Sequence, residues 1–372
     1  MLPGDIGAEL AAVITAAVAA GDLPPSASLL SAAGTWRPAP GDPPGQYSTS
    51  LPFRLAGPGH GARAIAGQLA TGLRGRDQIS AASATGAGYL TVTVTDAALT
   101  RLAVRMATAG PACARSDALA GRTVTAPASV DLVSAVTWAQ ARQQVTAVAA
   151  GRLAAAAGAQ VLALKEVERM VPASPGAGAA AGPAGPAVAF TGYAAVGYAL
   201  VRQPPGRAGG IDARKSVQYL RQNPFFAVTF ACRDAAATLR RAAERGLSPG
   251  NVAAFPAGAL AAPAERTLLS ALSWLPERAA AAGRRARPDE FARYLEDLAG
   301  AYLDVREICP VVPVGSGGGP GPAAVRARLW LAAAVRTALG TGLFLLAAAP
   351  QSGGPEAGGT AAAGGDPCGD AA

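Results

Sequence analysis

The sequence has few of the residues that most often carry catalysis or bind metals. Its 372 residues include one histidine, His60, and two lysines, Lys165 and Lys215. Aromatic residues make up 5% of the chain, and the four cysteines are far apart with no CxxC pair. Because zinc sites draw on closely spaced cysteines and histidines, we expect no metal site. His60 stands in "GPGHGAR" without a visible partner, which favours a solvated loop residue over a general base.

Other functional signatures are also missing. The run "GSGGGPG" at 315–321 lacks the Lys-Ser/Thr of a phosphate loop, and we expect no catalytic residue and no cofactor. The N-terminus lacks a basic region followed by an apolar core, so a signal peptide is not expected. The apolar segment 329–350 contains Arg336 and two glycines, which favours a buried helix over a membrane span. We therefore expect a cytoplasmic protein that does not bind membranes.

Positive charge is present but unevenly placed. Residues 201–336 contain 19 Lys and Arg against 11 Asp and Glu, whereas the rest of the chain has 13 of each. A basic domain beside a neutral one suggests a polyanionic partner, most simply nucleic acid. The predominance of arginine over lysine also fits GC-rich coding. A helical bundle with a biased codon supply therefore stays open as the alternative.

The pattern along the chain predicts an α+β fold. Residues 1–108 combine helical spacing in "PGDIGAELAAVITAAVAAG" and "ARAIAGQLATGL" with the alternation of a strand in "GAGYLTVTVTD". Residues 109–192 contain one long Ala-rich helix and a Pro/Gly/Ala linker. Residues 193–350 are helical almost throughout and predict an all-α bundle. Residues 351–372 are rich in Gly and Ala and predict a disordered tail.

The stretch "NPFFAVTFACRDAAATLRRAAERG", residues 223–246, predicts one helix with two distinct faces. One face is an apolar stripe that would pack on the core: Phe225, Val228, Cys232, Ala235 and Leu239. The other face carries Phe226, Phe230, Arg233, Arg240 and Arg241. Aromatics and arginines on one face could stack on unpaired bases and neutralise phosphates. Contact of the two phenylalanines with another helix remains the alternative.

The same stretch resembles the segment that opens the DALR-type anticodon-binding domain of arginyl-tRNA synthetases. The matching residues are Asn223, Pro224, Phe226, Val228 and Ala231, and Phe230 stands where the family has Tyr. The sequence departs from the family at Ala227, Thr229 and Cys232. Later segments continue the match in order: "ERTLLSALSWLPERA", "PDEFARYLEDLAGAYLDVREICPVV" and "ARLWLAAAVRTALGTGLFLLAAAP".

The N-terminal region is similar to the additional N-terminal domain of the same family. The matching positions are Gly45, Tyr47, Thr49, Arg63, Ile65, Ala66, Gly86, Gly88 and Tyr89. The resemblance implies that this domain contacts the corner of tRNA.

The family's catalytic signatures are not found between these two regions. Thr137, Trp138, Ala139 and Gln140 stand where the family has His-x-Gly-His, and only Arg142 of that motif remains. No Lys-Met-Ser-Lys-Ser run follows, and the roughly 85 intervening residues are fewer than a nucleotide-binding domain needs. The sequence resembles a synthetase that keeps its tRNA-binding ends and lacks its active site.

We therefore predict a non-catalytic, arginyl-tRNA-synthetase-like protein whose partner is tRNA. Two alternatives remain: a residual arginine–tRNA ligase that uses ATP, and a scaffold that binds a protein partner. The candidate tRNA-binding residues are Phe226, Phe230, Arg233, Arg240, Arg241, Arg293 and Arg306.

Overall fold

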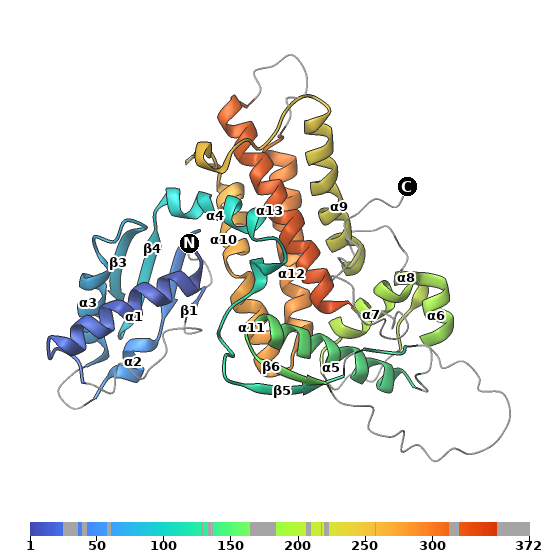
Figure 1. Cartoon of the computed structure of the whole chain (residues 1–372), viewed down its shortest axis with the longest axis horizontal. Coiled ribbons are helices and arrows are strands. Elements are labelled where there is room, and N and C mark those ends of the chain that lie inside the picture. The colour runs from blue at the N-terminus through green and yellow to red at the C-terminus, as the bar shows by residue number, and fades with distance from the viewer. Residues whose placement is uncertain are drawn as a thin grey trace, which may run out of the picture. The chain divides into compact units, whose positions relative to one another are not determined.

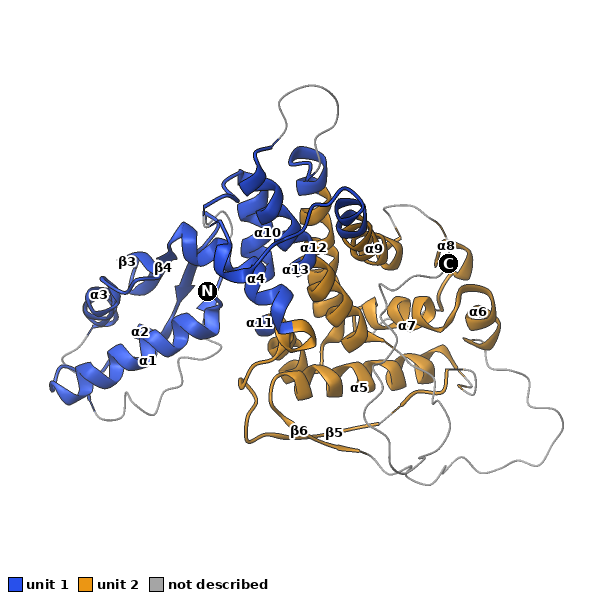
Figure 2. Cartoon of the chain, turned by 45° about the horizontal axis from the view of Figure 1, so that its top comes forward, with its two compact units in different colours: residues 1–109, 238–277, 304–334 blue, residues 110–237, 278–303, 335–372 orange. Residues whose placement is uncertain are grey.

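The structure is a computed structural model that forms two compact units. It describes residues 1–24, 36–38, 43–57, 61–127, 129–132, 135, 137–163, 184–205, 210–216, 218, 223–256, 258–311 and 320–347. Unit 1 contains residues 1–109, 238–277 and 304–334, and unit 2 contains residues 110–237, 278–303 and 335–372 (Figure 2). This division is based on packing, and most of its boundaries fall within helices that are given below. The sequence-based bounds 1–108, 109–192, 193–350 and 351–372 stay a prediction.

Unit 1 begins with an antiparallel sheet of order β1–β2–β4–β3 and its helices (Figure 1). The elements of this N-terminal region are α1 (Pro3–Ala19), β1 (Trp36–Arg37), β2 (Gln46–Thr49), α2 (Leu51–Leu55), α3 (Ala62–Leu73), β3 (Ile79–Thr85), β4 (Tyr89–Val94) and α4 (Asp96–Ala109). The helices and the strand predicted for this region are present. Alternation along β4 points Leu90, Val92 and Val94 into the core.

Helix α3 covers strands β3 and β4, and α1 packs on α3. The two helices approach closely at Gly72, where an added Cβ would lie 2.5 Å from Val13 Cγ1. Helix α1 starts with Pro3 in its first turn, and the Asp5 carboxylate accepts the Leu2 N–H at 2.7 Å. These features explain why a short N-terminal segment holds a defined helix.

The remaining elements of unit 1 are helical. They are η3 (Val252–Ala254), α10 (Pro263–Ser273) and the unit 1 parts of α9 (Pro224–Ala243), α11 (Leu275–Arg285), α12 (Pro288–Ile308) and α13 (Pro322–Leu346). Tyr47 of β2 is fully buried, donates to Ser273 Oγ at 2.9 Å and packs against Trp274 with ring centroids 5.4 Å apart. Burial raises the pKa of Tyr47 to about 12. Tyr47 thus joins the N-terminal sheet to the end of α10.

A buried ion pair joins α10 to the unit 1 part of α13. Arg328 Nε donates to Glu265 Oε1 at 2.7 Å, and the Glu265 side chain is 1% exposed. The other carboxylate oxygen of Glu265 accepts the Ala262 N–H at 3.0 Å and so caps α10. Glu265 therefore serves both the helix start and the helix–helix contact.

Unit 2 combines a small parallel sheet with helices. Its remaining elements are η2 (Gly110–Ala114), β5 (Thr123–Ala126), α5 (Trp138–Ala156), β6 (Gln160–Ala163), α6 (Ala184–Thr191), α7 (Tyr193–Arg202) and α8 (Ala213–Ser216). Strands β5 and β6 pair in parallel, and α5 lies between them in the sequence, so the three elements make a β–α–β unit. The sequence predicted the helix in this region and missed both strands. Most of the predicted linker lies outside the described residues.

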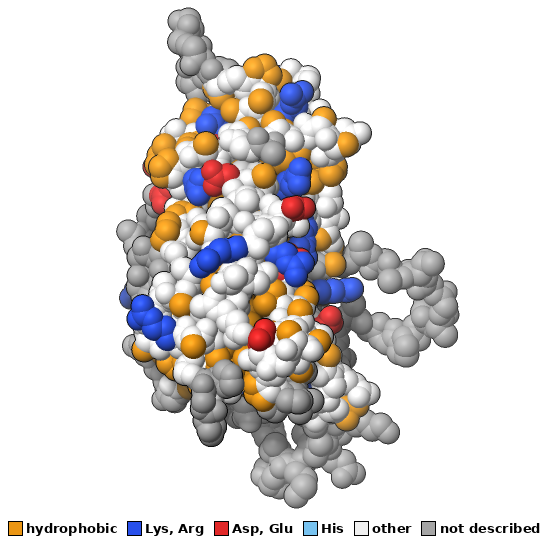
Figure 3. Space-filling view, turned by 90° about the vertical axis from the view of Figure 1, so that its left-hand side faces the viewer, with side chains coloured by type: hydrophobic (Ala, Val, Ile, Leu, Met, Phe, Trp, Pro, Cys, Tyr) orange, Lys and Arg blue, Asp and Glu red, His pale blue; other side chains and the backbone are white. Residues whose placement is uncertain are grey.

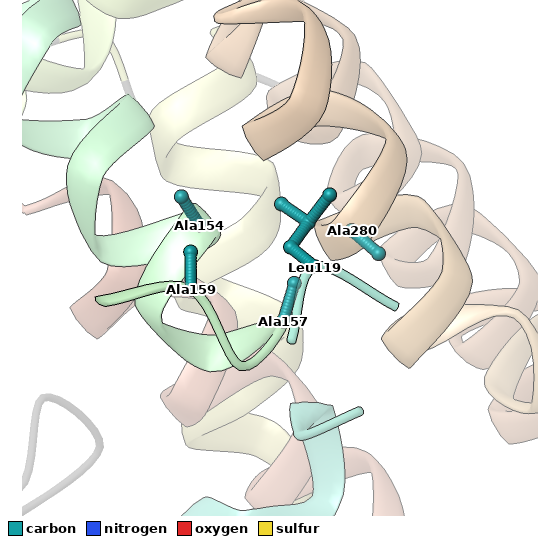
Figure 4. Close-up of a cluster of buried hydrophobic side chains, with 5 residues drawn as sticks. All are labelled: Leu119, Ala154, Ala157, Ala159 and Ala280. Atoms are coloured by element: carbon teal, nitrogen blue, oxygen red, sulfur yellow. The ribbon is translucent and has the colours of Figure 1, made fainter. Parts of the chain in front are cut away.

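Small side chains let the helices of unit 2 pack closely. Leu119 lies among Ala154, Ala157, Ala159 and Ala280 in one buried cluster (Figure 4). At the same cluster, an added Cβ on Gly283 would lie 2.7 Å from the Ala154 backbone nitrogen, and elsewhere in the unit one on Gly342 would lie 2.5 Å from Leu295 Cδ2. The many alanines and glycines of the sequence thus allow close contacts between these helices.

The fold class predicted from the sequence, α+β with a helical C-terminal region, is confirmed. Helix α13 is long and apolar enough to cross a membrane by length and composition, but 61% of its most apolar window is buried inside the protein. Buried core helices pass the same test, so this helix is weak support for a membrane span.

Candidate nucleic-acid interface

Helix α9 carries the two predicted faces. It begins after Asn223, whose amide nitrogen donates to the carbonyl oxygens of Ser216 and Gln218 at 2.8 and 3.0 Å. Pro224 then occupies the first helical position, where its missing N–H costs nothing. The Asn-Pro pair therefore fixes where the helix starts and which face turns inward.

The apolar face packs as expected. Val228, Cys232 and Ala235 are fully buried, and Phe225 packs against Tyr198 of α7 with ring centroids 5.6 Å apart. Tyr302 of α12 donates to the Asp234 carboxylate at 3.0 Å next to this face. These contacts set the rotation of α9 in unit 2.

The second face presents an aromatic pair. Phe226 and Phe230 stack with ring centroids 5.6 Å apart and an interplanar angle of 29°, one helical turn apart. Phe230 is 36% exposed, Phe226 is half-buried, and Arg233 is exposed on the next turn. A base could stack on the outer ring while the guanidinium contacts a phosphate. The geometry allows the predicted role.

The arginine series continues to the end of α9. Arg240 and Arg241 are exposed in the last turn, and Arg241 donates to Thr238 Oγ1 at 3.3 Å. Cations at the end of a helix also interact favourably with its dipole. The interaction with the helix dipole could therefore explain Arg240 and Arg241 at this position without any phosphate contact.

The two candidates on α12 differ from each other. Arg293 forms an ion pair with Asp289 one turn earlier at 3.2 Å, and Arg287 bonds the same carboxylate with two contacts of 2.8 Å. Burial by itself would raise the pKa of Asp289, but the bonds and charges of these arginines hold it below its ordinary value. Arg293 thus stabilises the start of α12. Arg306 is exposed in the last turn of α12.

Unit 1 holds a second exposed aromatic pair that the sequence analysis did not include among its candidates. Phe53 is 40% exposed and Tyr89 is 48% exposed, and their rings meet edge to face with centroids 5.0 Å apart. Gly88 precedes Tyr89 with φ +139°, and an added Cβ there would lie 2.7 Å from that of Ala62. Arg63 donates to the Gly86 carbonyl oxygen at 3.2 Å beside this turn. The sequence feature that could have pointed to this pair is the Gly-x-Gly-aromatic motif, because it places Tyr89 at the start of β4.

Charge is dispersed on the face of the molecule that includes the N-terminal elements. Figure 3 shows Lys and Arg side chains lying singly among Asp, Glu and uncharged atoms on this face. A nucleic-acid contact on this face would therefore not rest on a concentrated positive potential.

The start of α5 occupies the positions where the resemblance places a catalytic signature. Thr137 caps the helix by accepting the Gln140 N–H at 3.1 Å, and Trp138 follows at the first helical position. Arg142 donates through one nitrogen to the carbonyl oxygens of Gln203 and Pro204, each at 2.8 Å. Its guanidinium thus holds the end of α7 against α5.

No group of three metal-binding side chains occurs in the part of the chain that the structure describes, and His60 lies outside that part.

Comparison with known proteins defines the C-terminal region. Residues 233–351 match the family model of the DALR anticodon binding domain. The region is therefore an anticodon-binding domain of this class. It contains five of the candidates, Arg233, Arg240, Arg241, Arg293 and Arg306, while Phe226 and Phe230 lie just before it.

Over its C-terminal part the chain is related to arginine–tRNA ligases. It is 35% identical to the enzyme of Paenarthrobacter aurescens (strain TC1) over 159 residues, which are 43% of this chain and 28% of that protein. It is 36% identical to the enzyme of Clavibacter sepedonicus over 149 residues, 40% of this chain and 26% of that protein. The matches thus span little more than a quarter of the relatives' length.

A solved structure of Thermus thermophilus arginyl-tRNA synthetase is similar at 20% identity with a TM-score of 0.33, covering 60% of this chain and 39% of that one.

Proposed function

We propose that the protein binds tRNA through its DALR-type domain, in the cytoplasm, without charging the tRNA. The match of residues 233–351 to an anticodon-binding domain is the observation that carries the proposal. The partly exposed stack of Phe226 and Phe230, followed by Arg233, Arg240 and Arg241 on α9, supports it. Aromatic rings beside guanidiniums suit the unpaired bases and phosphates of an anticodon loop.

The second aromatic pair, Phe53 and Tyr89, is the candidate for another RNA contact in the N-terminal region. Both rings are exposed and in contact, and contiguous exposed apolar surface more often marks a binding site than singly scattered apolar side chains do. Two separate contacts would raise the affinity of the full chain above that of the C-terminal domain alone.

The absence of catalysis is the second part of the proposal. A class I synthetase needs cationic groups that stabilise charge on the reacting phosphate. At the corresponding helix start this chain has Thr137, Trp138, Ala139 and Gln140, none of which carries a positive charge. We expect no ATP–pyrophosphate exchange with arginine and tRNA present. Exchange that persists after removal of contaminating synthetase would favour the residual ligase instead.

The role of Phe230 can be separated from a packing role. Phe230→Ala should weaken tRNA binding by about 1–3 kcal/mol without changing its salt dependence, because base stacking involves no counterion release. Phe190→Ala is the matched control, since Phe190 is an exposed phenylalanine on α6. Fluorescence anisotropy with labelled tRNA measures both. If Phe230→Ala lowers the melting temperature and leaves the affinity unchanged, the ring serves packing.

A further inference from the structure

A cleft in unit 2 offers a site for a small molecule. Its volume is about 510 Å³, and it lies where α5 begins, α7 ends and α12 begins. The lining residues that matter most are Trp138, Arg142, Ala147, Gln203, Arg287 and Asp289. Pockets of this size hold small organic ligands.

One wall of the cleft is flat and apolar. The half-buried indole of Trp138 lies against the backbone of Gly210, where an added Cβ would be 2.8 Å from the indole Nε1. Ala147, Ala150 and Val201 extend the apolar lining. A ring held in place beside small side chains suits a planar partner.

The charge of the cleft favours an anion. Its lining contains two guanidiniums, Arg142 and Arg287, and one carboxylate, Asp289. Trp138 and Ala139 also line it as the first residues of α5, and backbone N–H groups at a helix start carry partial positive charge. The formal charges and the helix dipole thus act in the same direction.

A buried acceptor adds a third requirement. The side-chain oxygen of Gln203 is buried and receives no hydrogen bond from the described residues. A buried carbonyl oxygen without a donor is costly. Because this oxygen is closed to solvent, the Gln203 side chain has to turn toward the cleft to accept from an O–H or N–H group of a ligand, and the hydrogen bond gained there removes the cost.

We propose that this cleft binds a small planar anion, an aromatic ring with a carboxylate and a hydrogen-bond donor. This function goes beyond RNA binding and uses different residues. A nucleoside triphosphate fits less well, because no lysine for the phosphates occurs among the described residues that line the cleft.

Calorimetric titration of the full chain with 2-naphthoate and 2-naphthamide tests the charge requirement. The carboxylate should bind with one-to-one stoichiometry, and about tenfold more tightly than the neutral amide. Equal affinities, or displacement of 2-naphthoate by an equal concentration of Mg-ATP, would overturn the proposal.

Two substitutions test the location. Ala147→Leu fills the cleft and should weaken 2-naphthoate by about tenfold or more, whereas Ala155→Leu, at an exposed position of α5 outside the lining, should not. Gln203→Met keeps the size of the side chain and removes the acceptor. The unsubstituted protein should bind 6-hydroxy-2-naphthoate, which adds an O–H donor, more tightly than 2-naphthoate, and Gln203→Met should abolish this preference. Unchanged binding of both probes in Ala147→Leu and Gln203→Met would place their site elsewhere and overturn the proposal.

Discussion

Replacing Arg233, Arg240 and Arg241 together with alanine is expected to lower tRNA affinity by about 10²-fold near 0.1 M salt. Each phosphate contact releases counterions, so the loss of three contacts to a single-stranded loop should flatten the log–log salt dependence by about 2. All three side chains are exposed on α9, so the fold should tolerate their removal. Anisotropy titrations at several salt concentrations give both quantities.

The control for this result removes the same net charge elsewhere. Arg101, Arg115 and Arg122 are also exposed and lie outside α9. Their joint replacement with alanine should change the affinity and the salt slope much less. Equal effects of the two triple variants would mean that net charge alone attracts the RNA and that α9 is not the contact surface.

Glu265→Ala is expected to lower the free energy of unfolding by about 3–5 kcal/mol, because it leaves the Arg328 guanidinium without its partner in a nearly buried position. The loss of the cap on α10 adds about 1 kcal/mol. Denaturation by urea measures the change.

The neighbouring residue provides the control for Glu265. Arg266 pairs with Asp96 at 2.6 Å, but the Asp96 side chain is 63% exposed. Arg266→Ala should therefore cost only about 0–1 kcal/mol. Replacing both buried partners, as in Glu265→Met with Arg328→Met, should recover much of the loss. A small cost for Glu265→Ala alone would show that water reaches the Arg328 guanidinium.

Local patterns in the sequence were enough to predict α9 and its two faces. A spacing of three and four residues places Val228, Cys232 and Ala235 inward and Phe226 and Phe230 on the other side. The same spacing rule could also have predicted the ion pair between Asp289 and Arg293, because the two residues are one helical turn apart.

Contacts between distant segments could not be predicted in this way. Strands β5 and β6 have four residues each and pair across a 19-residue helix, so no local alternation marks them. Phe53 and Tyr89 come from different elements and meet only after the sheet has formed. The cleft at the start of α5 is likewise assembled from three separated segments.

The central claim is that tRNA is the partner of the DALR-type domain. Ultraviolet crosslinking of the protein in its own cells, followed by sequencing of the attached RNA, tests this claim most directly. The account predicts enrichment of tRNA, with crosslinked nucleotides concentrated in the anticodon arm. It also predicts that this enrichment is lost in the variant lacking Arg233, Arg240 and Arg241. Recovery of no RNA above the level of that variant would contradict the claim.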